Sequence, residues 1–93
     1  MTQKLQARSI SADNQFTDSV ELTGHFNISI SGIWDARVTV QRSFDKGSTW
    51  YDVATWEENT QEYGLEVERG VYYRAGIKPG EYSQGTCAVR LSQ

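Results

Sequence analysis

A tight turn is encoded in the middle of the chain by Ser43-Phe44-Asp45-Lys46-Gly47-Ser48-Thr49-Trp50. Asp45 can accept hydrogen bonds from backbone N–H groups two or more residues further on, and Gly47 supplies a positive φ at no steric cost. Thr49 is β-branched and suits the start of a return strand, over which the ring of Trp50 can fold. The stretch predicts a β-hairpin with Asp45, Gly47, Thr49 and Trp50 as its structural residues.

Apolar and polar residues alternate on both sides of this turn, as expected for strands with one wet face. Val38 and Val40 precede it, and Tyr51 and Val53 follow it. The same period of two recurs along the chain, and no window shows a helical period. The predicted strands are 3–10, 18–23, 25–31, 36–44, 49–56, 62–67, 71–78 and 85–92.

Short strands at regular spacing, punctuated by turn residues, predict an antiparallel β-sandwich of about seven or eight strands. Its topology is either immunoglobulin-like or jelly-roll, because periodicity does not report how strands connect. The 93 residues suffice for one domain, 1–93. Residues 11–15 have the most loop-like composition, so that residues 1–10 form a candidate N-terminal arm.

The segment around Gly70 and Tyr73 resembles the tyrosine corner of immunoglobulin-like sandwiches. In that motif a tyrosine hydroxyl hydrogen-bonds to the upstream backbone. The resemblance implies this role for Tyr73.

Charge and cysteine content exclude several classes of function. Nine basic and twelve acidic residues give a net charge of −3, with no Lys/Arg cluster, so no nucleic-acid partner is expected. No apolar run approaches the length of a membrane span, and no apolar leader follows Met1, so neither membrane partner nor signal peptide is expected. The single Cys87 cannot form an intrachain disulfide, which fits synthesis in a reducing cytosol.

No catalytic, metal or cofactor site is predicted. His25 is the only histidine, and Cys87 alternates with core residues and is expected to be buried. Serine, histidine and aspartate are all present, but no motif activates a serine. Glu66 and Glu68 could form a carboxylate pair, but their spacing on a strand predicts the wet face. The protein is therefore expected not to be an enzyme.

The aromatic residues exceed what a small core needs, so some are expected at the surface, where they favour partner binding or sugar stacking. The candidate interface residues are Trp34, Trp56 and Tyr72. Trp34 ranks first because it falls in a predicted turn, 32–35. The alternative is that Trp34 covers one end of the sandwich.

Two resemblances follow from these motifs. Residues 43–50 resemble the Asp-box, a structural hairpin motif of sialidase-like propellers that does no chemistry. The runs 20–24, 26–32, 38–45, 70–74 and 89–93 together resemble the small β-rich virion proteins of tailed bacteriophages and prophages, from about residue 9 to the end. The second resemblance implies a capsid decoration, neck or tail accessory protein, made in the host bacterial cytoplasm and carried in the virion.

Two functions from different classes are compatible with this sequence. The first is a virion structural protein that docks in many copies onto capsid, portal, neck or tail proteins. It would be a homo-oligomer in which residues 1–10 add a strand to a neighbouring copy and strand 62–68 faces water. The second is a carbohydrate-binding module of a phage fibre or similar surface protein. A sugar platform would need coplanar aromatic rings, whereas a protein interface would need a partly apolar patch with a polar rim.

Overall fold

The computed structural model describes residues 4–93, which form strands joined by turns and bends, with no helix in that range. The strand bounds are β1 Leu5–Ile10, β2 Gln15–Phe16, β3 Val20–Glu21, β4 Gly24–Ala36, β5 Val38–Ser43, β6 Tyr51–Trp56, β7 Thr60–Glu66, β8 Tyr72–Ile77 and β9 Tyr82–Ser92.

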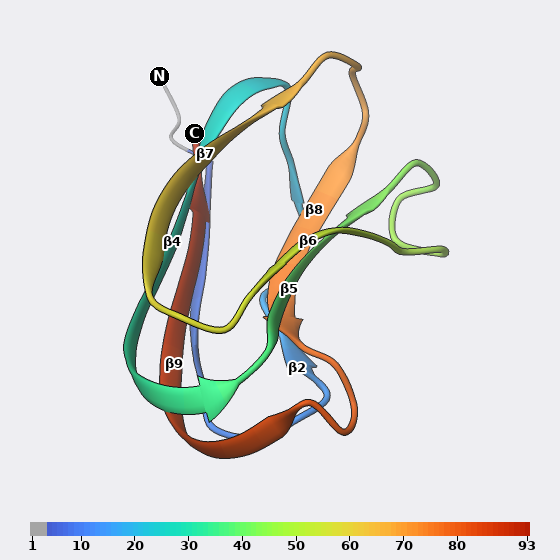
Figure 1. The fold of residues 1–93 in the computed structure, drawn as a ribbon. Coiled ribbons are helices and arrows are strands. Elements are labelled where there is room, and N and C mark those ends of the chain that lie inside the picture. The colour runs from blue at the N-terminus through green and yellow to red at the C-terminus, as the bar shows by residue number, and fades with distance from the viewer. Residues whose placement is uncertain (1–3) are drawn as a thin grey trace.

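The strands form two antiparallel sheets packed face to face (Figure 1). One sheet has four strands in the order β1-β9-β4-β7. The other has the order β2-β8-β5-β6, and β3 pairs with β8 beside β2. The predicted all-β class with antiparallel sheets is confirmed.

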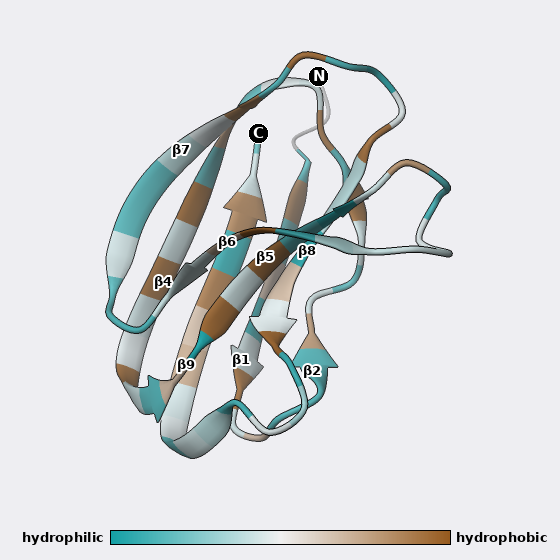
Figure 2. Cartoon of the chain, turned by 45° about the vertical axis from the view of Figure 1, so that its right-hand side comes forward, coloured by the Kyte–Doolittle hydropathy of each residue, from teal (hydrophilic) through white to brown (hydrophobic). Residues whose placement is uncertain are grey.

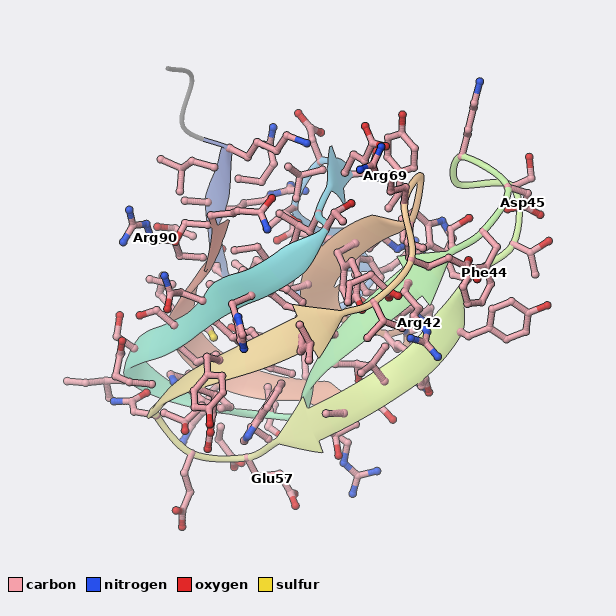
Figure 3. The ribbon with its side chains drawn as sticks, turned by 90° about the horizontal axis from the view of Figure 1, so that it is seen from above. Arg42, Phe44, Asp45, Glu57, Arg69 and Arg90 are labelled. Carbon is pink, nitrogen blue, oxygen red and sulfur yellow. The ribbon has the colours of Figure 1, made fainter. Side chains whose placement is uncertain are left out.

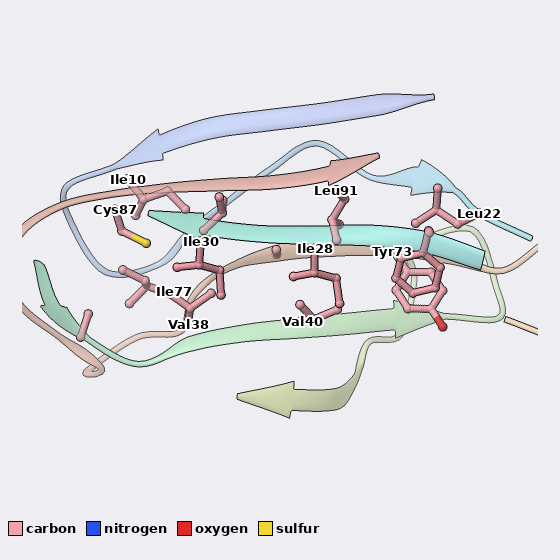
Figure 4. Packing of buried hydrophobic residues seen from close by; sticks show 14 of the residues in the cluster. Ile10, Leu22, Ile28, Ile30, Val38, Val40, Tyr73, Ile77, Cys87 and Leu91 are labelled. Atoms are coloured by element: carbon pink, nitrogen blue, oxygen red, sulfur yellow. The ribbon is translucent and has the colours of Figure 1, made fainter. Parts of the chain in front are cut away.

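The core lies between the two sheets and is built from the apolar half of each alternating strand. Hydropathy alternates along β4, β5 and β9 (Figure 2). Ile28 and Ile30 of one sheet face Val38 and Val40 of the other, and Cys87 is fully buried beside Ile10 at one end of the core (Figure 4). The other buried apolar residues are Ile10, Leu22, Phe26, Ala36, Val71, Tyr73, Ala75, Ile77, Val89 and Leu91. The prediction that Cys87 lies in the core is confirmed.

One predicted turn does not exist. Residues 32–35 were expected to end a strand, but β4 continues through them to Ala36 and pairs with β9. Gly32 has φ +112 and Gly85 in β9 has φ +90, and the Cβ of any other residue at position 85 would lie 2.3 Å from the Ile33 carbonyl oxygen. These glycines let the two strands stay paired where the sequence pattern indicates a break.

The N-terminal segment is part of the sandwich. Residues 5–10 form β1 and pair with β9 from Leu5–Ser92 to Ile10–Cys87. Position 3, where this strand was predicted to begin, lies outside the described residues. In the predicted loop 11–15, Gln15 begins the short strand β2.

Candidate interaction surface

The hairpin turn has the hydrogen bonds that its residue types predict. A carboxylate oxygen of Asp45 accepts from the backbone N–H of Thr49 at 2.8 Å and from the hydroxyl of Ser43 at 2.6 Å. The Ser43 hydroxyl oxygen in turn accepts from the N–H of Gly47 at 2.8 Å. These bonds lower the pKa of Asp45, chiefly through Ser43. Gly47 has φ +97, so the turn needs its glycine.

A stack of one cation and two aromatic rings fastens this turn to the sheet. The Arg74 guanidinium lies 4.1 Å from the ring centre of Phe16 and 4.4 Å from that of Trp50. The Trp50 ring also covers Gly47, where a Cβ would lie 3.4 Å from it. The turn is therefore held against the outer face of the five-stranded sheet, which fixes the orientation of the residues beside it.

Exposed apolar side chains gather next to the turn, at the start of the edge strand β6. Phe44, Tyr51 and Val53 are 51%, 54% and 48% exposed and line a shallow depression with Arg42 and Asp52. The rings of Phe44 and Tyr51 are 6.1 Å apart and tilted by 47°, and the Arg42 guanidinium lies 5.1 Å from the Phe44 ring centre. Figure 3 shows Arg42 and Phe44 beside the turn that carries Asp45. We call Phe44, Tyr51 and Val53 the apolar cluster.

An ion pair between the half-exposed Arg42 and the buried Glu66 lies at this depression. Arg42 lies 3.2 Å from a carboxylate oxygen of Glu66, which also accepts from the Tyr73 hydroxyl at 2.7 Å. The other Glu66 oxygen accepts from the N–H of Glu68 at 3.1 Å. These contacts link the two sheets at the side where β6 and β7 are the outermost strands.

The environment of this pair sets its protonation. Burial disfavours the charged form of Glu66, but the hydrogen bonds from Tyr73 and Glu68 and the charge of Arg42 outweigh burial and lower its pKa. Burial, assisted by the bond to Glu66, raises the pKa of Tyr73 to about 12. At neutral pH Glu66 is therefore a carboxylate, and Tyr73 is a neutral phenol that donates a hydrogen bond to it.

Two predictions about these residues are wrong. Glu66 was placed on the wet face but is only 3% exposed, since β7 directs Gly64 and Glu66 inward and Tyr63 and Leu65 outward. Tyr73 was expected to donate to the upstream backbone, but its acceptor is the side chain of Glu66. Both differences have one cause. The Glu66 carboxylate occupies a core position because Arg42 and the Tyr73 hydroxyl supply the hydrogen bonds that it needs there.

Trp34 is not in a turn but in β4, half-buried and packed against the core. Its indole N–H donates to the side-chain oxygen of Asn59 at 2.7 Å, and the Asn59 amide donates to the Gly32 carbonyl at 3.0 Å. Trp34 thus fits the alternative prediction, in which it covers one end of the sandwich.

The other two candidate interface residues are also separate from the apolar cluster. Trp56 ends β6 half-buried and packs against the core, while Tyr72 begins β8 and is half-buried. The structure does not bring Trp34, Trp56 and Tyr72 into one surface patch.

The apolar cluster was not identified as a site from the sequence, although its residues stand in the quoted hairpin. Tyr51 and Val53 alternate like core residues, and only the pairing shows why they are exposed. Val40 pairs with Ala54 and Gln41 with Asp52, so Val53 is an extra residue in an edge strand. A bulge of this kind leaves no signal in apolar periodicity.

Other potential reactive groups stand apart. His25 is exposed, and burial raises the pKa of the Cys87 thiol to about 11. Within residues 4–93, no three His, Cys, Asp or Glu side chains lie close enough together to hold a metal ion. The described chain also contains no helix with the length and apolar character to cross a membrane.

Comparisons with known proteins return no relatives. No family model, curated protein sequence or solved structure matches the chain.

Proposed function

We propose that this chain is a structural component of a bacteriophage virion, namely a capsid decoration, neck or tail accessory protein, which works by binding other virion proteins. The observation that carries the proposal is the apolar cluster. Three large apolar side chains, each about half exposed, are held beside a turn that is itself fixed by hydrogen bonds and by the Arg74 stack. A preorganised patch of this kind loses little side-chain entropy on binding.

The chemistry of the cluster fits an apolar or aromatic side chain of a partner protein. Phe44, Tyr51 and Val53 supply the apolar centre, while Arg42 and Asp52 supply a polar rim. A sugar platform would need coplanar rings, but the two rings here are tilted by 47° and Arg42 already lies over Phe44. Protein docking is therefore preferred to the carbohydrate-binding alternative.

The finer topology that we propose is the jelly roll. Strand pairing is nested, so that β1 pairs with β9, the short β2 and β3 with β8, β4 with β7, and β5 with β6. Such nesting is what a long antiparallel hairpin gives when it is rolled up. An immunoglobulin order would set the last strand beside the one before it, whereas β9 pairs with β1 and β4.

Jelly rolls occur in viral capsid proteins and in lectins, so the topology is compatible with both candidate functions and favours no enzyme. The role proposed here needs no catalytic residue and no cofactor. The partners would be capsid, portal, neck or tail proteins together with other copies of this chain, and the site of action would be the virion, after synthesis in the bacterial cytoplasm.

Co-sedimentation with virus particles from the encoding host tests the proposal. Wild-type chain should sediment with the particles, and Tyr51→Ser combined with Val53→Ser should lose this association while remaining folded. Ile33→Ser is the matched control, because Ile33 is 91% exposed and lies on β4, away from the apolar cluster. If the double variant sediments like wild type, the docking surface is wrong. If the wild-type chain does not sediment with particles and binds a glycan saturably, the carbohydrate-binding function replaces the proposed virion function.

A further inference from the structure

Two of the four sheet edges are built in ways that discourage strand addition, and two are not. In the five-stranded sheet, β6 carries the bulge at Val53 and the opposite edge consists of two two-residue strands. In the four-stranded sheet, β1 and β7 have six and seven residues, contain no proline, and pair with their inner neighbours without a register shift. The open edges of this molecule therefore belong to one sheet.

The directions of these two strands make them complementary. Every neighbouring pair in the order β1-β9-β4-β7 is antiparallel, so β1 and β7 run in opposite directions. If a second copy is set beside the first in the same orientation, its β1 lies antiparallel to β7 of the first. The sheet can then continue from copy to copy without turning any copy over.

The backbone groups of β1 that point away from the molecule can be identified. Lys4 and Gln93 exchange both of their backbone hydrogen bonds, at 3.2 and 2.8 Å. Hydrogen-bonded pairs alternate along an antiparallel ladder, so the next residues of β1 that bond to β9 are Gln6, Arg8 and Ile10. The N–H and C=O groups of Leu5, Ala7 and Ser9 therefore point to the free edge.

The same alternation, carried across β9 and β4, identifies the free groups of β7. The residues of β7 that bond to β4 are those opposite Phe26, Ile28 and Ile30, which leaves the backbone groups of Gln61, Tyr63 and Leu65 at the free edge. No backbone hydrogen bond within residues 4–93 uses the outer side of either strand.

Side chains on the two edges are complementary in charge and size. Arg8 is the charged residue of β1, where one of its guanidinium nitrogens donates to the Phe16 carbonyl at 2.7 Å, and Lys4 directly precedes the strand, whereas the exposed charge of β7 is Glu62. Leu5 and Leu65 are 42% and 56% exposed, and both side chains lie on the outer face of the sheet. Charges on edge strands oppose pairing with an edge of the same sign, so two copies of β1 or two of β7 are disfavoured.

We propose that a second copy of this chain binds by adding its β1 to β7 of the first, within one continuous sheet. The register sets Leu5 opposite Leu65, Ala7 opposite Tyr63 and Ser9 opposite Gln61 as hydrogen-bonded pairs. Between them Arg8 faces Glu62 and Gln6 faces Gly64. All six residues of β1 are then paired, with like faces of the sheet aligned.

This contact is head-to-tail, so it builds rings or filaments rather than closed two-fold dimers. The inference deepens the proposed virion role, on which it rests, by naming the second copy as a partner and the edges that join. Many copies linked in this way would present the apolar cluster repeatedly, which raises avidity for a repetitive particle surface.

Disulfide trapping tests the register. Ser9→Cys and Gln61→Cys place thiols on exposed positions of the two edges, and the native Cys87 is buried. Two strands separate these edges within one chain, a gap of roughly 14 Å that no disulfide can span. Mixing the two single variants under mild oxidation should give a dimer containing one of each, and the double variant should give a ladder of oligomers.

The control replaces Ser9→Cys with Ser31→Cys, an exposed serine on the interior strand β4, and should give no mixed dimer with Gln61→Cys. Dimers formed by Ser9→Cys alone would indicate two-fold β1 pairing and overturn the proposal. A yield of mixed dimer no higher than in the control would also overturn the proposal. If the chain nevertheless sediments with particles, only the edge pairing is wrong and the virion role stands. Mixed dimers with no particle binding would leave the pairing in place and refute the virion role.

Charge reversal gives an independent measurement. Arg8→Glu alone and Glu62→Arg alone should each lose self-association in sedimentation velocity, since each variant has two edges of the same sign. An equimolar mixture should recover self-association, because each contact then joins opposite charges. Equal self-association of wild type and both single variants would contradict the register.

Discussion

At the scale of single residues, the pair of Glu66 and Arg42 with Tyr73 is the most consequential feature. Burying an ionised carboxylate in the core of a 93-residue protein is costly unless it is fully hydrogen-bonded, and here Glu66 receives bonds from a phenol, a guanidinium and a backbone N–H. It also joins the two sheets beside the apolar cluster. Alternation along 62–68 could not reveal this, because the partners of Glu66 come from β5 and β8.

We predict that stability depends on pH through Glu66. Its pKa is lower in the folded chain than in the unfolded chain, so its contribution is complete above the ordinary glutamate pKa of about 4.3 and is lost as pH falls through the lowered value. Glu66→Gln should cost about 1–3 kcal/mol at pH 7 and flatten the acid limb of stability. Urea unfolding at pH 7 and pH 3 measures both effects. Glu58→Gln, at an exposed position outside the strands, is the control, and an equal loss in both variants would contradict this role.

We predict that substitutions in the hairpin turn lower the stability of the folded chain. Gly47→Val should lower the free energy of unfolding by about 1–3 kcal/mol, because φ +97 strains a β-branched residue and the Trp50 ring covers the site. Asp45→Ala should lower the melting temperature by removing the acceptor for Thr49 and Ser43. Thermal unfolding measures both. If Asp45→Ala kept full stability but abolished particle binding, the structural role of this turn would be wrong.

At the scale of elements, β4 and β9 show where sequence patterns are insufficient. Alternation correctly indicated strands around 25–31 and 85–92, because each has one buried face. It failed at 32–35, where Gly32 and Asp35 resemble turn residues although the partner strand, with Gly85, allows the ladder to continue. The pairing between segments distant in sequence cannot be predicted from the residues of either segment alone.

A matched pair of variants isolates this close approach. Gly85 and Gly80 have φ of +90 and +81, so an alanine meets similar backbone strain at both positions. Only at 85 would its Cβ also collide with backbone, 2.3 Å from the Ile33 oxygen and 2.6 Å from the Trp34 Cα. Gly85→Ala should therefore destabilise the chain by at least about 1 kcal/mol more than Gly80→Ala in chemical denaturation. Equal effects would show that the strands separate there without cost.

At the scale of the whole molecule, the sequence supports a sandwich but does not choose its topology or its surface. The predicted interface residues Trp34, Trp56 and Tyr72 are half-buried and lie outside the apolar cluster, and Trp34 and Trp56 pack against the core. The apolar cluster and the open edges of β1 and β7 emerge only when the sheets are assembled. Both depend on which strands lie at an edge.

We propose that this chain is a docking component of a virion, present in many copies. Quantitative mass spectrometry of gradient-purified particles from the encoding host tests it most directly. The chain should be present at a constant copy number, many per particle, and this number should fall when Tyr51→Ser and Val53→Ser are introduced together. Absence of the wild-type chain from particles, while it is abundant in the same lysate, would contradict the claim.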